Sequence, residues 1–173
     1  MKSLELKEII LIAILAALSI VTKPLVTNLS AVMVGSFGIP NGVVGGIIYM
    51  MWLSLIFRLV SKPFVVLGFT VLQGILAIMI MGMPPLGLVS YVASGIGGEM
   101  VLFPLRKKHQ LFVNMLAGAV ANSVGAVAVY FLFFSKNVDP LPLVVTLSFF
   151  SGSLSGILTT GIYSRLKNHW QTA

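Results

Sequence analysis

The chain has 173 residues, of which 58% are hydrophobic and only 9% charged, and its mean hydropathy is +1.06. A soluble domain carries about 25% charged residues, so this composition excludes a water-soluble globule, a disordered chain and a disulfide scaffold. The sequence has no cysteine, which excludes disulfides, iron–sulfur clusters and thiol chemistry. The net charge of +7 indicates positive-inside membrane topology rather than nucleic-acid binding.

The N-terminal segment combines a charged start with an apolar run, as a signal peptide does. Because Glu5 and Glu8 lie in the charged part and no polar domain follows, we interpret residues 5–22 as a retained first span. Lys23-Pro24 is expected to end it, because proline lacks a backbone donor and restricts the residue before it. We therefore expect an external loop over residues 23–40, whose apolar part at 25–34 is re-entrant or interfacial.

Five further apolar runs follow, each bounded by breakers or charges, at residues 41–59, 63–81, 86–105, 111–134 and 141–163. Runs of about 20 apolar residues match the thickness of a bilayer. The sequence thus predicts an all-α integral membrane protein, a compact bundle of six transmembrane helices forming one domain over residues 1–173.

The basic residues indicate the orientation of this bundle. With six spans, only Lys23 and Lys136 fall on one side of the membrane, and the other nine basic residues fall on the opposite side: Lys2, Lys7, Arg58, Lys62, Arg106, Lys107, Lys108, Arg165 and Lys167. Since basic loops stay inside, both termini are predicted to be cytoplasmic.

Several kinds of chemistry are missing from the sequence. The glycine-rich stretch at residues 42–46 lacks the Lys-Ser/Thr of a phosphate loop, and no connection is long enough for an ATPase domain. His109 and His169 lie in polar segments apart from any carboxylate cluster, so no metal site is expected. No histidine lies within a span to activate a serine. We expect neither enzymatic activity nor a cofactor.

Small residues four apart allow close packing of membrane helices. Such a stripe occurs at Ala13 and Ala17 in the first span, where it is equally suited to internal packing and to contact with another subunit. Two further stripes, interpreted as internal packing, comprise Gly118, Asn122 and Ala126 in the fifth span and Ser148, Gly152, Gly156 and Thr160 in the sixth.

Polar residues within the spans are the candidates for binding a solute. Glu99 is the only acidic residue inside a span, and it either forms an ion pair with Arg58, Arg106 or Lys107 or binds a cation or amine. Lys23 either snorkels to the interface or faces a ligand. The other candidates are Asn28 in the expected loop, Gln73 and Asn122, whose amides must face the interior, and the aromatic ring of Tyr91.

Fewer than 200 residues, six spans, cytoplasmic termini, a long first external loop and Ala13-x-x-x-Ala17 together resemble the substrate-binding S component of energy-coupling factor (ECF) vitamin transporters. The resemblance implies a membrane-embedded protein without enzymatic activity that captures a vitamin or precursor from outside. It further implies docking on a transmembrane coupling subunit, through Ala13 and Ala17, and on two ATPase subunits. The paired tryptophans of thiamine-binding members and the Met-His start of nickel and cobalt members are absent.

From these observations we expect the substrate-capture subunit of an ATP-driven importer, multi-pass in the plasma membrane of a prokaryote. Its partners would be a small-molecule substrate, the coupling subunit, two ATPases and the lipid bilayer, without nucleic acid. The predicted substrate-binding residues are Lys23, Asn28, Gln73, Tyr91, Glu99 and Asn122. Two alternatives are a stand-alone facilitator or proton-coupled carrier, and a membrane scaffold that transports nothing.

Overall fold

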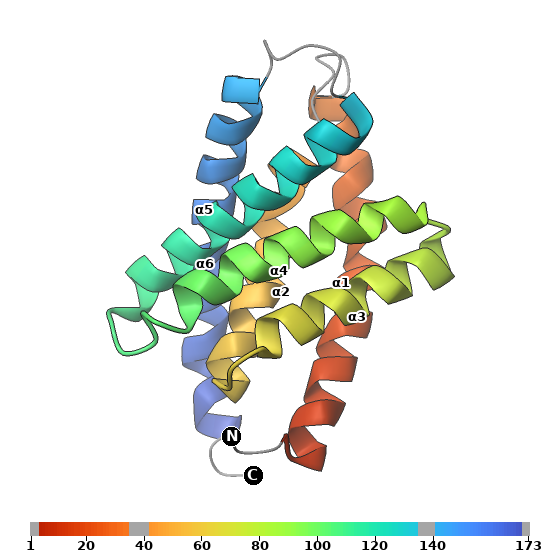
Figure 1. Cartoon of the computed structure of the whole chain (residues 1–173). Helices are drawn as coiled ribbons and strands as arrows, with labels where there is room; N and C mark the ends of the chain where they lie inside the picture. The colour runs from red at the N-terminus through yellow and green to blue at the C-terminus, as the bar shows by residue number, and fades with distance from the viewer. Residues whose placement is uncertain (1–3, 35–41, 135–140, 171–173) are drawn as a thin grey trace.

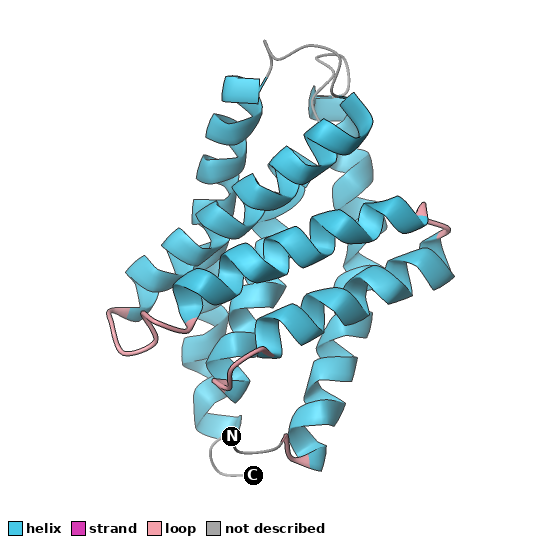
Figure 2. Cartoon of the chain, viewed as in Figure 1, coloured by secondary structure: helices cyan, strands magenta, loops and turns pink. Residues whose placement is uncertain are grey.

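The computed structural model describes residues 4–34, 42–134 and 141–170, which form six α-helices without a strand (Figures 1 and 2). The helices are α1 (Leu6–Val34), α2 (Gly42–Val60), α3 (Val65–Met81), α4 (Leu88–Leu102), α5 (Gln110–Val129) and α6 (Leu141–Trp170). A short 3₁₀ turn at Pro85–Gly87 precedes α4, and a π-helical turn at Tyr130–Phe134 extends α5. The predicted all-helical fold is thereby confirmed.

The helices have the length and composition that a bilayer requires. Among the described residues, five helices are long and apolar enough to cross a membrane. The sixth, α3, is equally apolar but has 17 residues, which is at the lower end of the range that spans a hydrocarbon core of about 30 Å.

Helix α2 is the centre of the bundle, since it packs against each of the other five helices. Around it, neighbouring helices contact one another in the order α1, α3, α4, α5, α6, and the two ends of this series, α1 and α6, each contact α2. In Figure 1, α3, α4 and α5 cross obliquely in front of the more upright α1, α2 and α6. The apolar span of α2 is 67% buried and that of α1 only 22%, so α1 is the helix that leaves most of its surface uncovered.

The basic residues gather at one end of the bundle. The start of α1 and the end of α6 lie together at the bottom of Figure 1, and the α2–α3 and α4–α5 connections also point to the lower half. These segments carry Lys7, Lys62 and the run Arg106–Lys108. The placement agrees with the charge pattern of the sequence, and the cytoplasmic location of this end remains a prediction.

The first helix differs from the sequence prediction. The span was expected to end at Lys23-Pro24, but α1 continues through Pro24 to Val34, so residues 25–34 are neither re-entrant nor a loop. Proline removes the N–H that would bond to the carbonyl four residues earlier, here that of Ile20, and membrane helices tolerate this where neighbours and local adjustments compensate. With 29 residues, α1 is about 43 Å long. The rest of the expected loop, residues 35–40, lies outside the described residues.

The small-residue stripes of α5 and α6 serve internal packing, as predicted. A Cβ atom added to Gly152 would lie 2.2 Å from the carbonyl oxygen of Gly118, and one added to Gly156 would lie 2.2 Å from the backbone nitrogen of Met115. The two backbones are therefore in direct contact, and only glycine fits at these positions.

Candidate functional site

One face of α1 carries three polar side chains, Ser19, Lys23 and Thr27, spaced four residues apart. We call this set the polar stripe. Residues at this spacing lie above one another on a helix. Each member contacts a different helix, so α1 is joined to α3, α4 and α2 through polar side chains rather than through apolar packing alone.

Lys23 lies at the middle of the polar stripe and points into the bundle. Its Nζ donates to the hydroxyl of Tyr91 on α4, and it lies 4.4 Å from the centroid of the Tyr91 ring. The centroid of Tyr49 on α2 is 5.9 Å away. Of the two orientations that the sequence left open, Lys23 is therefore turned toward α4 and α2 rather than out of the bundle. That it faces a ligand there stays a prediction.

Thr27 completes the cluster from the next turn of α1. Its Oγ1 lies 2.7 Å from the hydroxyl of Tyr49, with which it shares a hydrogen bond. We refer to Lys23, Thr27, Tyr49 and Tyr91 as the cation–aromatic cluster. All four side chains are half-buried. A cation over aromatic rings is stabilised by the negative face of the π system, more strongly where water is excluded.

Two glycines make room for the tyrosines of this cluster. A Cβ atom at Gly45 would lie 2.7 Å from the ring of Tyr49. At Gly74 it would lie 3.3 Å from the Cβ of Tyr91 and 2.4 Å from the side chain of Leu88. The rings are thus seated directly against the backbones of α2 and α3.

Gln73 lies beside the cluster, where it bonds to the polar stripe. Its Nε2 donates to Ser19 Oγ at 2.6 Å, and Ser19 Oγ donates to the carbonyl of Ala16 at 2.6 Å. Ser19 precedes Lys23 by one turn, about 6 Å along the axis. Gln73 therefore joins α3 to α1 within one helical turn of Lys23.

Asn122 is engaged in packing contacts between three helices. Its Nδ2 donates to the carbonyls of Val43 and Ser148, at 3.1 and 3.0 Å, and to Ser151 Oγ at 2.8 Å. A Cβ atom at Gly46 would lie 2.0 Å from the same nitrogen. The amide thus joins α2, α5 and α6 at their closest approach.

Glu99 accepts hydrogen bonds from the backbone at the start of α3, a role that the sequence did not suggest. Its Oε1 accepts from the backbone N–H of Phe64 at 2.9 Å, and its Oε2 accepts from those of Val66 and Leu67 at 3.0 and 3.4 Å. A carboxylate from α4 therefore caps the N-terminus of α3, where free N–H groups and the helix dipole favour an anion. Of the two roles that the sequence left open for Glu99, the ion pair is not formed in the described structure, whose ion pairs are Lys7–Glu5 and Lys62–Glu8. The binding of a cation or amine stays a prediction, and Glu99 lies eight residues from Tyr91, about 12 Å along α4.

Arg58 instead belongs to a buried network of neutral oxygens at the basic end. Its Nε donates to Asn114 Oδ1 at 2.8 Å, and its terminal nitrogens donate to the carbonyls of Arg106 and Gln110 at 3.5 and 3.4 Å. Asn114 Nδ2 donates in turn to Thr160 Oγ1 at 3.0 Å. This network holds the α4–α5 connection against α2 and α6.

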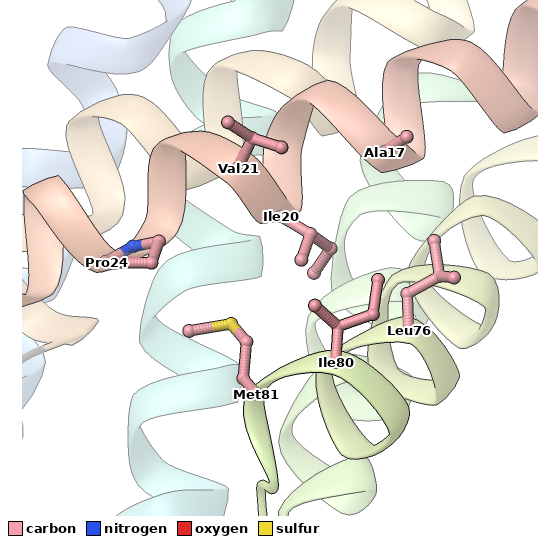
Figure 3. A pocket seen from close by; sticks show the side chains of 7 residues that line it. All are labelled: Ala17, Ile20, Val21, Pro24, Leu76, Ile80 and Met81. Carbon is pink, nitrogen blue, oxygen red and sulfur yellow. The ribbon is translucent and has the colours of Figure 1, made fainter.

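The opposite side of α1 is apolar and open. Ala13 and Ala17 are exposed, whereas Ala16 is fully buried, so the alanine pair faces away from the bundle. Beside Ala17 lies a groove of about 450 Å³ between α1 and α3 (Figure 3), lined by Ala17, Ile20, Val21, Pro24, Leu76, Ile80 and Met81. No polar candidate of the sequence lines this groove.

The structure thus brings together two predicted site residues, Lys23 and Tyr91, with Gln73 beside them. The polar atoms of Glu99 bond at the start of α3 and those of Asn122 bond on α2 and α6, and Asn28 lies exposed on α1 one residue after Thr27. Ser19 and Thr27 were missed, although their spacing of four residues from Lys23 is a signal that the sequence contains.

Comparisons with known proteins bear on the fold. No protein-family model and no curated protein matches the chain. A solved structure described as an S-component of an ECF transporter has the same fold, with a TM-score of 0.77 and 26% sequence identity. The match covers 95% of this chain and 86% of that one. The resemblance to the S components of ECF transporters is therefore confirmed, and the chain is a multi-pass helical membrane protein with the S-component fold.

Proposed function

We propose that this chain is the substrate-capture subunit of an ATP-driven ECF-type importer for a vitamin, a vitamin precursor or a similar small organic molecule. The observation that carries the proposal is the fold match, which extends over nearly the whole chain rather than over a few helices. It acts in the plasma membrane of a prokaryote, with both termini in the cytoplasm. Its task is binding rather than chemical conversion.

The proposed binding site is the cation–aromatic cluster, extended by Gln73 and by Asn28. Polar side chains facing one another inside an otherwise apolar bundle are expensive to place there and are a common mark of a substrate site. The cluster joins α1, α2 and α4 through contacts between side chains. Glu99 and Asn122 are left out of the site, because their polar atoms are engaged in holding helices together.

The proposed surface for the coupling subunit is the exposed face of α1 around Ala13 and Ala17. Small side chains let a foreign helix approach closely, which is the main source of helix association in lipid. The apolar groove beside Ala17 adds a concave surface of matching chemistry. The coupling subunit and two ATPases supply the motor, and differential binding of substrate to two states of the subunit links capture to release.

Reconstitution tests this proposal. Coexpressed with a coupling subunit and two ATPases, the wild-type chain should co-purify with them and take up solute into proteoliposomes only with ATP. The double variant Ala13→Trp, Ala17→Trp should lose co-purification while keeping the affinity of the wild type for the molecule it retains in mild detergent. Leu18→Trp, on another exposed face of α1, is the matched control and should co-purify normally.

Three results would contradict the proposal or its docking face. Uptake by the chain alone, without any ATPase, would indicate a stand-alone carrier. Failure to retain any small organic molecule, together with no ATPase partner, would indicate a scaffold. Normal co-purification of the double variant would show that the docking face lies elsewhere on the molecule.

A further inference from the structure

We infer that the molecule captured at the cation–aromatic cluster carries an anionic group, a carboxylate or a phosphate, which pairs with the ammonium of Lys23. This inference rests on the proposed function and names the substrate class for the same site. It is carried by the geometry of Lys23 and by the distribution of negative charge over the described chain.

Among the described residues, Lys23 is a cation turned into the bundle with no carboxylate paired to it. In the part of the chain that the structure describes, its polar partner is the Tyr91 hydroxyl, flanked by the rings of Tyr91 and Tyr49. A hydroxyl and two rings offer partial charges only. They compensate in part for removing an ammonium from water, and a buried charge ordinarily has a full opposite charge beside it.

The described carboxylates are all used elsewhere, away from Lys23. Glu8 pairs with Lys62 at 2.5 Å, Glu5 lies 3.7 Å from Lys7, and Glu99 caps α3. The fourth carboxylate of the sequence, Asp139, lies outside the described residues. The described structure therefore leaves one positive charge in this cluster for an anion that the bound molecule brings.

The neighbouring groups suit such a molecule. When an anion takes the place of the Tyr91 hydroxyl as the acceptor of Lys23, that hydroxyl is released to donate its own proton to the anion. The Thr27 and Tyr49 hydroxyls, 2.7 Å apart, offer a second polar contact to the rest of the molecule. Bonds to charged groups are the stronger ones, so the exchange favours binding.

The test uses the full chain purified in mild detergent and analyses the small molecules that it retains by mass spectrometry. We expect an organic acid or organic phosphate. Lys23→Met should lower the affinity for that molecule about 100-fold, as removal of one partner of a buried charge pair does. Lys23→Arg should keep more affinity than Lys23→Met. Lys7→Met, the same exchange at an exposed site on α1, should leave the affinity unchanged.

Benzoate and its neutral counterpart benzamide serve as probes of defined charge. At millimolar concentration benzoate should raise the thermal midpoint of the wild type, and benzamide should not. In the Lys23→Met variant, neither benzoate nor benzamide should raise the thermal midpoint. The empty Lys23→Met protein should melt a few degrees above the wild type, since a cation without a counterion has been removed, and this also verifies that the variant folds.

Three outcomes would overturn the inference. In the first, the retained small molecule is neutral or cationic and Lys23→Met binds it normally, which leaves the capture function itself intact. In the second, only a phospholipid is retained, so the anion is a lipid headgroup. In the third, Lys23→Met and Asp139→Asn both lower the midpoint of the empty protein, which identifies Asp139 as the counterion.

Discussion

The cap on α3 gives the sharpest stability prediction, through the change Glu99→Gln. The carboxylate accepts two backbone bonds of 2.9 and 3.0 Å and a longer one of 3.4 Å. The Phe64 that it holds has φ 62°, a left-handed conformation that is unfavourable for a bulky residue and persists only where its surroundings fix it. The glutamine keeps one acceptor oxygen and turns an NH₂ group toward N–H groups of α3.

The magnitude follows from these contacts. A bond to a charged acceptor is worth about 1.5–3 kcal/mol and a neutral one about 0.5–1.5, so the bond that survives weakens by about 1 kcal/mol. The buried N–H that now faces an NH₂ group costs about 1–3 kcal/mol. The sum is roughly 2–4 kcal/mol. At about 2–4 °C per kcal/mol for a chain of this size, the thermal midpoint should fall by roughly 5–15 °C.

The assay is the midpoint of heat-induced loss of the monodisperse peak in size-exclusion chromatography, measured in one detergent for all variants. Glu5→Gln is the control, since that carboxylate is exposed and lies 3.7 Å from Lys7, and it should shift the midpoint little. Affinity for the retained molecule should be unchanged in Glu99→Gln below its midpoint. A variant that melts like the wild type but has lost that affinity would refute the cap and make Glu99 a substrate ligand.

Two further predictions concern the packing of α6. Gly152→Ala should strongly lower the same midpoint because the added Cβ would lie 2.2 Å from the Gly118 carbonyl, whereas Gly161→Ala on the same helix meets nothing within 4 Å and should be tolerated; equal midpoints would contradict the backbone contact. Asn122→Ala should destabilise by about 2–3 kcal/mol, since interhelical hydrogen bonds in membranes contribute about 0.6–1.7 kcal/mol each. The adjacent Ser123→Ala removes a buried hydroxyl without a hydrogen-bond partner, so it should be neutral or stabilising, and a loss equal to that of Asn122→Ala would speak against the network.

The features that the sequence predicted are those that depend on local pattern. The count of six helices follows from hydropathy over windows of bilayer length, and the glycine stripes of α5 and α6 follow from a spacing of four. The exposure of both Ala13 and Ala17 agrees with their spacing of four residues, which places them on the same side of α1. Lys23 and Tyr91, both candidate binding residues of the sequence, contact each other, and the binding of a substrate by them stays a prediction.

The features that the sequence missed depend on contacts between helices. Pro24 was expected to end a span, which is a sound rule in water, but membrane helices tolerate proline where neighbouring helices surround them, and α1 continues through Pro24 to Val34. Glu99 was expected either to pair with a basic side chain or to bind a cation or amine, because side-chain charges are visible in a sequence, whereas the free N–H groups at the start of α3 are visible only once α3 and α4 lie side by side.

The build of α1 has a mechanical consequence. One side of this helix bears Ala17, where a coupling subunit would press, and the other bears Lys23, six residues further on and about 9 Å along the same axis. A helix that moves as a rigid body carries the side chains on all of its faces with it. Any displacement of α1 that docking would impose at Ala17 is therefore transmitted to the ammonium of Lys23 beside Tyr91. The proposed substrate site and the proposed docking surface are thus coupled through one helix.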